Sequence, residues 1–330
     1  MTMAPEDRPQ REDLDRAILG EEPELTAGEV AEAAGASLDD TRRLWRALGF
    51  PEHPFEAAFT QGDVDALRRV FQMVESGFID LDLAVNLTRA LGQTMARLAD
   101  WEVATLVGRF EQLAHGTEDS DDSRIGLGLE LIDHINTPFE QQLVYAWRRH
   151  LAAAVARVEA LAANEEDLHT SVVTCGFADI VGFTALSNEL GEHKVGDLVE
   201  LFESRCADVV ASQHGRIIKS IGDSVLFVNE SAERAIDTAE GIVAVVGRDP
   251  RMPDVRLGLA TGTVVNRLGD VFGPPVNMAA RLTVVARRNR VIIDRSTAAQ
   301  LSDTDFDTRA LPPRPARGFG LIEPMAVRRR

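Results

Sequence analysis

At 330 residues the chain is long enough for two domains that each bury a core of their own. Its 53 acidic and 35 basic side chains leave a formal charge of −18, which argues against a generic surface for nucleic acid or anionic membranes, because binding a polyanion needs a basic face. Cys175 and Cys206 are the only cysteines, too few for a disulfide framework and without zinc-site spacing, so a reducing compartment is expected.

The N-terminal sequence and the hydropathy pattern bear on localisation. The first fifteen residues lack the basic segment and apolar stretch of a secretory signal. No uncharged apolar run approaches the roughly 18 residues that span a bilayer. We therefore expect a cytoplasmic protein with no membrane span.

Residues 13–164 have a helical pattern, and we expect an all-α domain over residues 1–138. Apolar side chains recur at intervals of three and four, and strand-like alternation is rare. The clearest example is the series Leu81, Leu83, Val85, Leu87, Leu91, Met95 and Leu98.

Residues 25–51 predict a helix, a tight turn and a second helix. Thr26 and Glu29 have the spacing of a capping box, and Gly35 marks the turn. Ser37 can cap the second helix, and Gly49 can end it. The segment resembles the helix-turn-helix of winged transcription regulators.

Two carboxylates argue against DNA binding by this segment. Asp39 and Asp40 lie at the start of the would-be recognition helix, where phosphates and base edges would approach. We therefore favour a packing role within a regulatory module.

A long helix and a polar segment are expected to connect two domains over residues 139–167. The helix, predicted over 139–163, carries apolar side chains at Trp147, Leu151, Val155 and Val158. After residue 167 strands and helices alternate, which predicts an α+β catalytic domain over residues 168–330. The strands are expected at 171–180, 216–220, 224–228, 255–261 and 291–294, and the helices near 185–212, 232–246 and 276–287.

Two aspartates lie at strand ends in this second half. Asp179 follows a β-rich run and precedes a glycine and a helix, and Asp223 follows Gly222 at a predicted hairpin apex. Two such carboxylates can hold Mg²⁺ or Mn²⁺, hard cations that prefer oxygen ligands and bridge to phosphates. Taken singly, Asp179 is equally consistent with a helix cap and Asp223 with a turn residue.

A third segment carries an amide and a guanidinium on one helix. Pro274 and Pro275 mark the helix entry, and Asn277 and Arg281 are four residues apart, so they share a face. Spacing alone leaves open a solvent-facing pair without function.

Together these segments resemble the class III nucleotidyl cyclase catalytic domain, over about residues 171–327. Six separated positions match that family in order and spacing. The resemblance implies a ferredoxin-like fold and two divalent metal ions, Mg²⁺ or Mn²⁺, in each active site. It assigns the metals to Asp179, Asp223 and the backbone carbonyl of Ile180.

The same resemblance implies ATP as substrate and cyclic AMP as product. It assigns adenine recognition to Lys219 and Asp270, where guanylate-specific relatives carry other residues, and assigns the ribose and the reacting phosphorus to Asn277 and Arg281. A weaker match places Arg317 on the triphosphate.

Family members build each active site from two subunits, so a chain with all six side chains is expected to act as a homodimer. A helical N-terminal domain joined to such a catalytic domain is similar to soluble mycobacterial adenylate cyclases, some of which respond to pH or lipid. We therefore expect proton or lipid regulation through the N-terminal domain, with His150 either titrating or simply exposed. The alternatives are a catalytically silent nucleotide-binding regulator and a DNA-binding protein with a cyclase-like domain.

Overall fold

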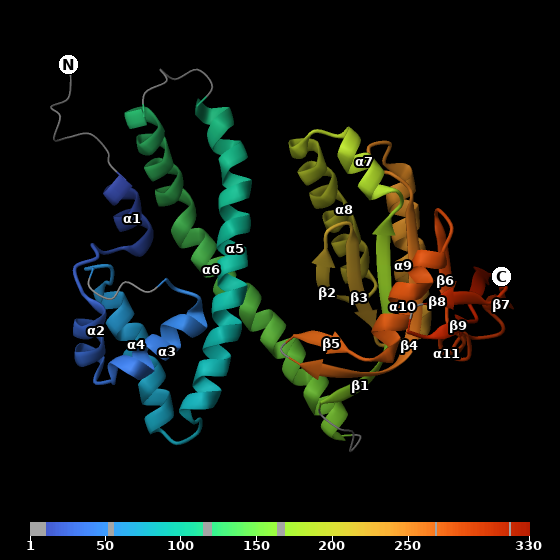
Figure 1. Cartoon of the computed structure of the whole chain (residues 1–330), viewed down its shortest axis with the longest axis horizontal. Helices are drawn as coiled ribbons and strands as arrows, with labels where there is room; N and C mark the ends of the chain where they lie inside the picture. The colour runs from blue at the N-terminus through green and yellow to red at the C-terminus, as the bar shows by residue number, and fades with distance from the viewer. Residues whose placement is uncertain (1–10, 52–55, 115–120, 164–168, 268, 317) are drawn as a thin grey trace. The chain divides into compact units, whose positions relative to one another are not determined.

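The computed structural model describes residues 11–51, 56–114, 121–163, 169–267, 269–316 and 318–330. It divides into two compact units, Met1–Ala152 and Ala153–Arg330, and the division falls within one long helix. Figure 1 shows helices alone in the first unit's ribbon and a sheet with helices in the second.

The first unit is helical, as the sequence predicts. The long helix α6 begins at Asp121, well before the expected start near Phe139, because Pro138 is accommodated inside it. The helices are α1 (Arg11–Leu19), α2 (Ala27–Ala34), α3 (Leu38–Leu48), α4 (Gln61–Glu75), α5 (Leu81–Ala114) and α6 (Asp121–Ala163), the last of which continues into the second unit.

The helix-turn-helix of α2 and α3 is confirmed down to its caps. Thr26 and Glu29 form the reciprocal capping box at the start of α2, and Gly35 ends that helix in the left-handed conformation. The Ser37 side chain accepts from the Asp40 amide at the start of α3, and Gly49 ends the helix with φ of 85°.

One face of the second helix of this motif packs into the core of the unit. Leu44 and Trp45 are buried in the unit's core, and the Trp45 ring stacks on Phe59 with 4.1 Å between ring centroids. α3 also contacts α5, where Arg43 forms an ion pair with Asp82.

The second unit is built on a βαββαβ arrangement. In chain order it runs β1 (Thr170–Ile180), α7 (Phe183–Glu189), α8 (Glu192–Ser212), β2 (Arg216–Ile221), β3 (Ser224–Asn229), α9 (Ala232–Arg248) and β4 (Val255–Arg267). The strands lie in the order β2-β3-β1-β4, and all three neighbouring pairs are antiparallel. This is the ferredoxin-like fold that the resemblance implied.

Two predicted boundaries in this unit differ from the structure. The single helix expected over 185–212 is interrupted at Leu190 and Gly191, where Leu190 takes an extended conformation. The strand expected to end at residue 261 continues to Arg267, because its second half pairs with both β1 and a short strand, β5 (Asp270–Phe272).

The sheet continues beyond β4 with later strands, in the order β4-β6-β10-β7. Figure 1 shows these strands together near the C-terminus. The remaining elements are α10 (Pro274–Val285), β6 (Arg290–Ile293), α11 (Arg295–Ala298), β7 (Phe306–Ala310), β8 (Arg314–Ala316), β9 (Gly320–Ile322) and β10 (Met325–Arg329).

Two apolar cores cover opposite faces of the sheet. Side chains of α8 and α9 share one core with Ala178 and Ile180 of β1. Side chains of α10 share the other with Cys175 of β1 and Leu226 of β3. Since neighbouring residues of a strand point to opposite faces, Asp179 points to the α10 face.

Helix α10 lies very close to the sheet at Gly258 of β4. A Cβ atom there would lie 2.3 Å from the backbone nitrogen of Thr283 and 2.4 Å from the carbonyl oxygen of Ala279. Only glycine allows this approach, which fixes α10, and the residues it carries, against β4.

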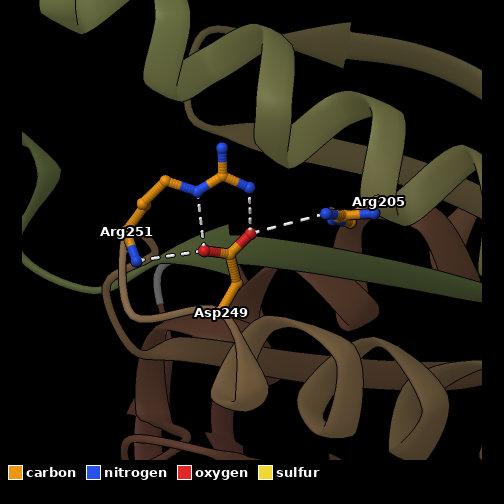
Figure 2. A network of polar contacts seen from close by, with 3 residues as sticks. All are labelled: Arg205, Asp249 and Arg251. Carbon is orange, nitrogen blue, oxygen red and sulfur yellow. Dashed lines mark hydrogen bonds and ion pairs between the residues drawn. The ribbon is translucent and has the colours of Figure 1, made fainter.

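A polar network ties α8 to the end of α9 (Figure 2). The Asp249 carboxylate accepts from Arg251 Nε at 2.9 Å and Nη2 at 2.6 Å, and from Arg205 Nη2 of α8 at 3.5 Å. The hydrogen bonds from Arg251 hold the pKa of Asp249 well below its ordinary range.

Candidate active site

Asp179 lies near the end of β1, between two strands that fix its carboxylate. Its backbone pairs with Ser224 of β3 on one side and Arg256 of β4 on the other. Both partners contact the carboxylate: the Ser224 hydroxyl donates to Oδ1, and Arg256 Nε donates to Oδ2 at 2.7 Å. The residue is buried, so this carboxylate is held in place.

Asp223 lies beside this carboxylate, in the turn between β2 and β3. Gly222 has φ of 60°, the left-handed conformation that lets two residues reverse the chain. The Ile180 amide donates to the Asp223 carbonyl at 3.1 Å, which ties the turn to the end of β1. Burial, and then the charge of Asp179, raise the pKa of Asp223.

Sequence reasoning missed Arg256. It lies directly opposite Asp179 on β4, and Nη2 also approaches Oδ2 of Asp179 at 2.7 Å. Only the strand register brings these residues together, because they are 77 positions apart in sequence. This end of the sheet therefore carries an arginine as well as the two aspartates.

The carboxylate pair fits a divalent cation. Asp179 and Asp223 are neighbouring acids, and two carboxylates side by side form an anionic oxygen cluster of the kind hard cations prefer. In the described part of the chain no group of three or more His, Cys, Asp or Glu side chains is placed to hold a metal. Water and phosphate oxygens would therefore have to complete the coordination, as is common for Mg²⁺.

Lys219 and Asp270 contact each other on the α10 face of the sheet, the face to which Asp179 points. Lys219 pairs with Leu226, whose side chain belongs to the α10 core. Its Nζ lies 2.5 Å from Asp270 Oδ2 and 5.9 Å from the centroid of the Phe272 ring. Both charged side chains remain partly exposed, so a donor, an acceptor and an aromatic ring are presented side by side.

Asn277 and Arg281 lie one turn apart on α10, whose first residues are Pro274 and Pro275. Asn277 is exposed, and Arg281 is partly buried. The Arg281 Nε atom is itself buried and has no hydrogen-bond partner within the described residues. Because an unsatisfied buried donor is costly, this N–H group is suited to donate a hydrogen bond to an anionic partner.

The structure thus brings the predicted residues together in pairs. Asp179 is beside Asp223, and Lys219 is beside Asp270, with Asn277 and Arg281 on one helix. The described residues include no hydrogen bond or ion pair that joins one pair to another. Arg317, the remaining predicted site residue, lies outside the described residues.

Two families match the chain, one in each unit. Residues 166–323 match the adenylate and guanylate cyclase catalytic domain, and residues 12–110 match the adenylate cyclase regulatory domain. An adenylate cyclase of Streptomyces coelicolor is 36% identical, over 96% of this chain and 89% of its own length. An adenylate cyclase of Streptomyces griseus is 38% identical, over 91% of this chain and 74% of its own length.

The chain belongs to the adenylate cyclase family. It is an enzyme of that family, with the helical regulatory region preceding the cyclase domain. A relative named as a pH-sensitive adenylate cyclase of Mycobacterium tuberculosis is 29% identical, over 92% of this chain and 78% of its own length.

Solved structures similar to this adenylate cyclase include other nucleotidyl cyclases. The catalytic core of a rhodopsin-guanylyl cyclase with converted specificity, in complex with ATPαS, gives a TM-score of 0.45 at 23% identity, over 48% of this chain and 97% of its own. The adenylyl cyclase CyaB from P. aeruginosa gives 0.42 at 21% identity, over 48% of this chain and 94% of its own. Within its described residues, this adenylate cyclase has no helix long and apolar enough to cross a membrane.

Proposed function

We propose that this enzyme converts ATP to 3′,5′-cyclic AMP and pyrophosphate. The observation that carries the choice of ATP is the Lys219–Asp270 contact at 2.5 Å. A lysine donor can meet N1 of adenine, and an aspartate acceptor can take a hydrogen from the exocyclic amine. Guanine presents the opposite pattern at both positions, so this pair favours ATP. With ATP as substrate, we place the enzyme in the cytoplasm.

Asp179, Asp223 and the carbonyl of Ile180 are the proposed ligands of two Mg²⁺ or Mn²⁺ ions. When bound, such ions lower the pKa of the ribose 3′-hydroxyl and neutralise the triphosphate charge. The proximity of the two carboxylates supports this assignment: burial, and then the charge of Asp179, raise the pKa of Asp223.

The proposed reaction is an in-line displacement without a covalent enzyme intermediate. The ribose 3′-oxygen bonds to the α-phosphorus as the bond to pyrophosphate breaks, and the hydroxyl loses its proton. Arg281, whose buried Nε lacks a partner in the described structure, would meet the charge that develops on the α-phosphoryl oxygens. Asn277, one turn earlier on α10, would orient the ribose.

Arg256 is a further cation near the site, in addition to the six positions that match the cyclase family. It pairs with Asp179 in the structure. An arginine at this end of β4 would be available to a phosphate oxygen once other cations balance Asp179. Arg317 is retained as a proposed contact to the triphosphate.

We further propose that the enzyme acts as a homodimer in which each site takes Asp179 and Asp223 from one subunit and the base, ribose and phosphate contacts from the other. Among the described residues no hydrogen bond or ion pair joins these groups of residues within one chain, and this supports the arrangement. Helix α6 also exposes an apolar stripe suited to a helical partner, formed by Trp147, Leu151, Val155 and Val158.

Residues 1–138 are proposed to regulate this dimer, with 139–167 as the connecting segment, in response to protons or lipid. His150 is exposed on α6 within the proposed connecting segment. The packing of Leu44 and Trp45 into the core supports a packing role for the helix-turn-helix, and Asp39 and Asp40 at the start of α3 disfavour DNA binding. A fragment of residues 165–330 with the rate and pH profile of the full chain would end this part of the proposal.

The deciding experiment measures cyclic nucleotide formation by the full-length protein with ATP or GTP and Mn²⁺. We expect cyclic AMP from ATP, little product from GTP, and no product from Asp223→Ala. Mn²⁺ binding, followed by electron paramagnetic resonance, should weaken in the same variant. No product from the full chain or from the 165–330 fragment would favour a catalytically silent nucleotide-binding regulator.

A further inference from the structure

A fork opens in the sheet between β6 and β10, next to the strand that carries Arg256, since Arg290 of β6 pairs in register with Arg256 of β4. The two strands pair at Met325 with Ile293 and at Ala326 with Ile292, and then separate. A cavity of about 990 Å³ lies where they part, and none of the proposed site residues that the structure describes lines it.

Both apolar cores reach this cavity, because the sheet is open there. Val243 of α9 and Val291 of β6 line it and pack against the core on the α8 and α9 face. Val285 of α10 and Leu311 line it and pack against the core on the α10 face. The cavity therefore has an apolar wall to which both cores contribute.

Arginines dominate the polar part of the wall. The side chains of Arg287, Arg290, Arg309 and Arg314 line the cavity, and none has an ion pair or hydrogen bond within the described residues. All four are exposed to solvent. They gather here in a chain whose formal charge is −18.

The two carboxylates in the wall are already committed to other arginines. Asp307 pairs with Arg328 at 3.3 Å, and Glu240 pairs with Arg329 at 2.8 Å. Neither carboxylate therefore neutralises the positive charge of the four unpaired arginines. Like charges around a concave surface repel one another and focus a positive potential, and a bound anion relieves that repulsion.

We propose that the fork cavity binds a phosphorylated small molecule of about nucleotide size. Guanidinium groups match phosphate oxygens with paired hydrogen bonds, which a carboxylate-poor wall leaves available. The volume of about 990 Å³ lies at the upper end of the range of about 300–1,000 Å³ for small-molecule sites. The apolar wall fits a ring or chain attached to the phosphates, so an organic phosphate is favoured over a bare inorganic ion.

Calorimetric titration of the full-length protein with ADP, in EDTA, tests this site. We expect saturable binding whose affinity falls about tenfold or more in the double variant Arg309→Ala/Arg314→Ala, since each arginine contributes charge-assisted hydrogen bonds. Arg248→Ala is the matched control, because Arg248 is an exposed arginine of α9 that does not line the cavity. Its affinity for ADP should equal that of the parent.

A second pair of titrations separates this cavity from the active site and from simple anion binding. Binding should persist in Lys219→Ala, which alters the proposed base contact but not the fork. Pyrophosphate should bind at least about tenfold more weakly than ADP, because it cannot use the apolar wall. Equal affinities for ADP and pyrophosphate would indicate a site for inorganic anions and would contradict the proposal of an organic phosphate.

The proposal is overturned if the double variant binds ADP as tightly as the parent, if binding disappears only in Lys219→Ala, or if no binding tighter than about 1 mM is found. Thermal unfolding of the double variant tests whether its loss of ADP affinity is caused by misfolding. We expect its melting temperature to equal or exceed that of the parent without ligand, because two repelling charges have been removed. The stabilisation by ADP should then be smaller than in the parent.

Discussion

Asp179 and Arg256 lie directly opposite each other on β1 and β4, and Arg256 donates to the Asp179 carboxylate at 2.7 Å. The pair is largely shielded from solvent, with side chains 13% and 30% exposed. A carboxylate that the catalytic proposal assigns to metal is therefore balanced by an arginine in the metal-free chain.

This pair should be coupled energetically. We expect Asp179→Asn and Arg256→Leu each to lower the free energy of unfolding by about 1–3 kcal/mol, because each leaves a partly buried charge without its partner. The double variant should lose less than the sum, with a coupling energy of about 1 kcal/mol or more. Urea denaturation of the four proteins in EDTA measures it.

The exposed pair Arg295–Glu323 is the matched control for that cycle. Its atoms lie 2.6 Å apart, but its side chains are 78% and 56% exposed. Solvent screening should reduce its coupling to about 0–0.5 kcal/mol. Equal coupling in the two cycles would contradict the assignment of Asp179 and Arg256 as a shielded pair.

Gly258→Ala should destabilise the catalytic unit. The added methyl group would meet the α10 backbone at 2.3–2.4 Å, so the helix must move from β4. We expect a loss of about 1–3 kcal/mol in the free energy of unfolding. Gly247→Ala on α9 is the control, since a Cβ there meets no atom within 4 Å, and it should be neutral or stabilising.

Displacement of α10 should also affect catalysis, because that helix carries Asn277 and Arg281. Gly258→Ala should therefore lower kcat for cyclic AMP formation even at temperatures where the protein is folded. A folded Gly258→Ala protein with unchanged kcat would show that the close contact does not position the two side chains.

The Asp249 network should stabilise the protein in a pH-dependent way. The hydrogen bonds from Arg251 and Arg205 lower the pKa of Asp249 in the folded state. A depressed folded-state pKa contributes stability above the unfolded-state value of about 3.9, and that contribution is lost as the pH falls below it. Asp249→Asn should therefore unfold at lower urea concentration than the parent at pH 7.

The difference between parent and Asp249→Asn should be the same at pH 7 and pH 5.5 and should narrow near pH 3. Asp303→Asn serves as the control and should show little difference at any pH, because Asp303 is an exposed turn carboxylate with no ion pair to any residue that the structure describes. A difference between parent and Asp249→Asn that grows in acid would have the wrong sign for this network.

Shared active sites predict complementation between two inactive variants. Asp223→Ala removes a proposed metal ligand, and Arg281→Ala removes a proposed phosphate contact that the homodimer draws from the other subunit. Random exchange of equal amounts leaves half of the dimers mixed, each with one intact site, so activity should recover to about a quarter of the parent value.

Each variant alone should show almost no cyclic AMP formation, and the mixture should regain activity only after subunits exchange. Mixing Asp223→Ala with Asp179→Ala is the matched control, because both changes fall in the same half of the site and no intact site can form. Recovery in that control, or none in the first mixture, would contradict a shared site.

Local sequence signals predicted the ends of several helices and the position of a hairpin. The capping box at Thr26, the left-handed glycines at Gly35 and Gly49 and the hairpin at Gly222 all act within a few residues, so the structure reproduces them. Local signals failed at Pro138, which lies inside α6, and at β4, whose extra length depends on pairing with distant strands.

The sequence by itself determined the two-part organisation, the ferredoxin-like catalytic fold through its family resemblance, and the types of side chain available for the chemistry. Only the tertiary structure decided which of them are in contact. Arg256 meets Asp179 because two strands pair in one register, and four arginines converge because β6 and β10 separate. Strand register and sheet opening depend on the packing of residues far apart in the chain, and periodicity along the chain carries no record of it.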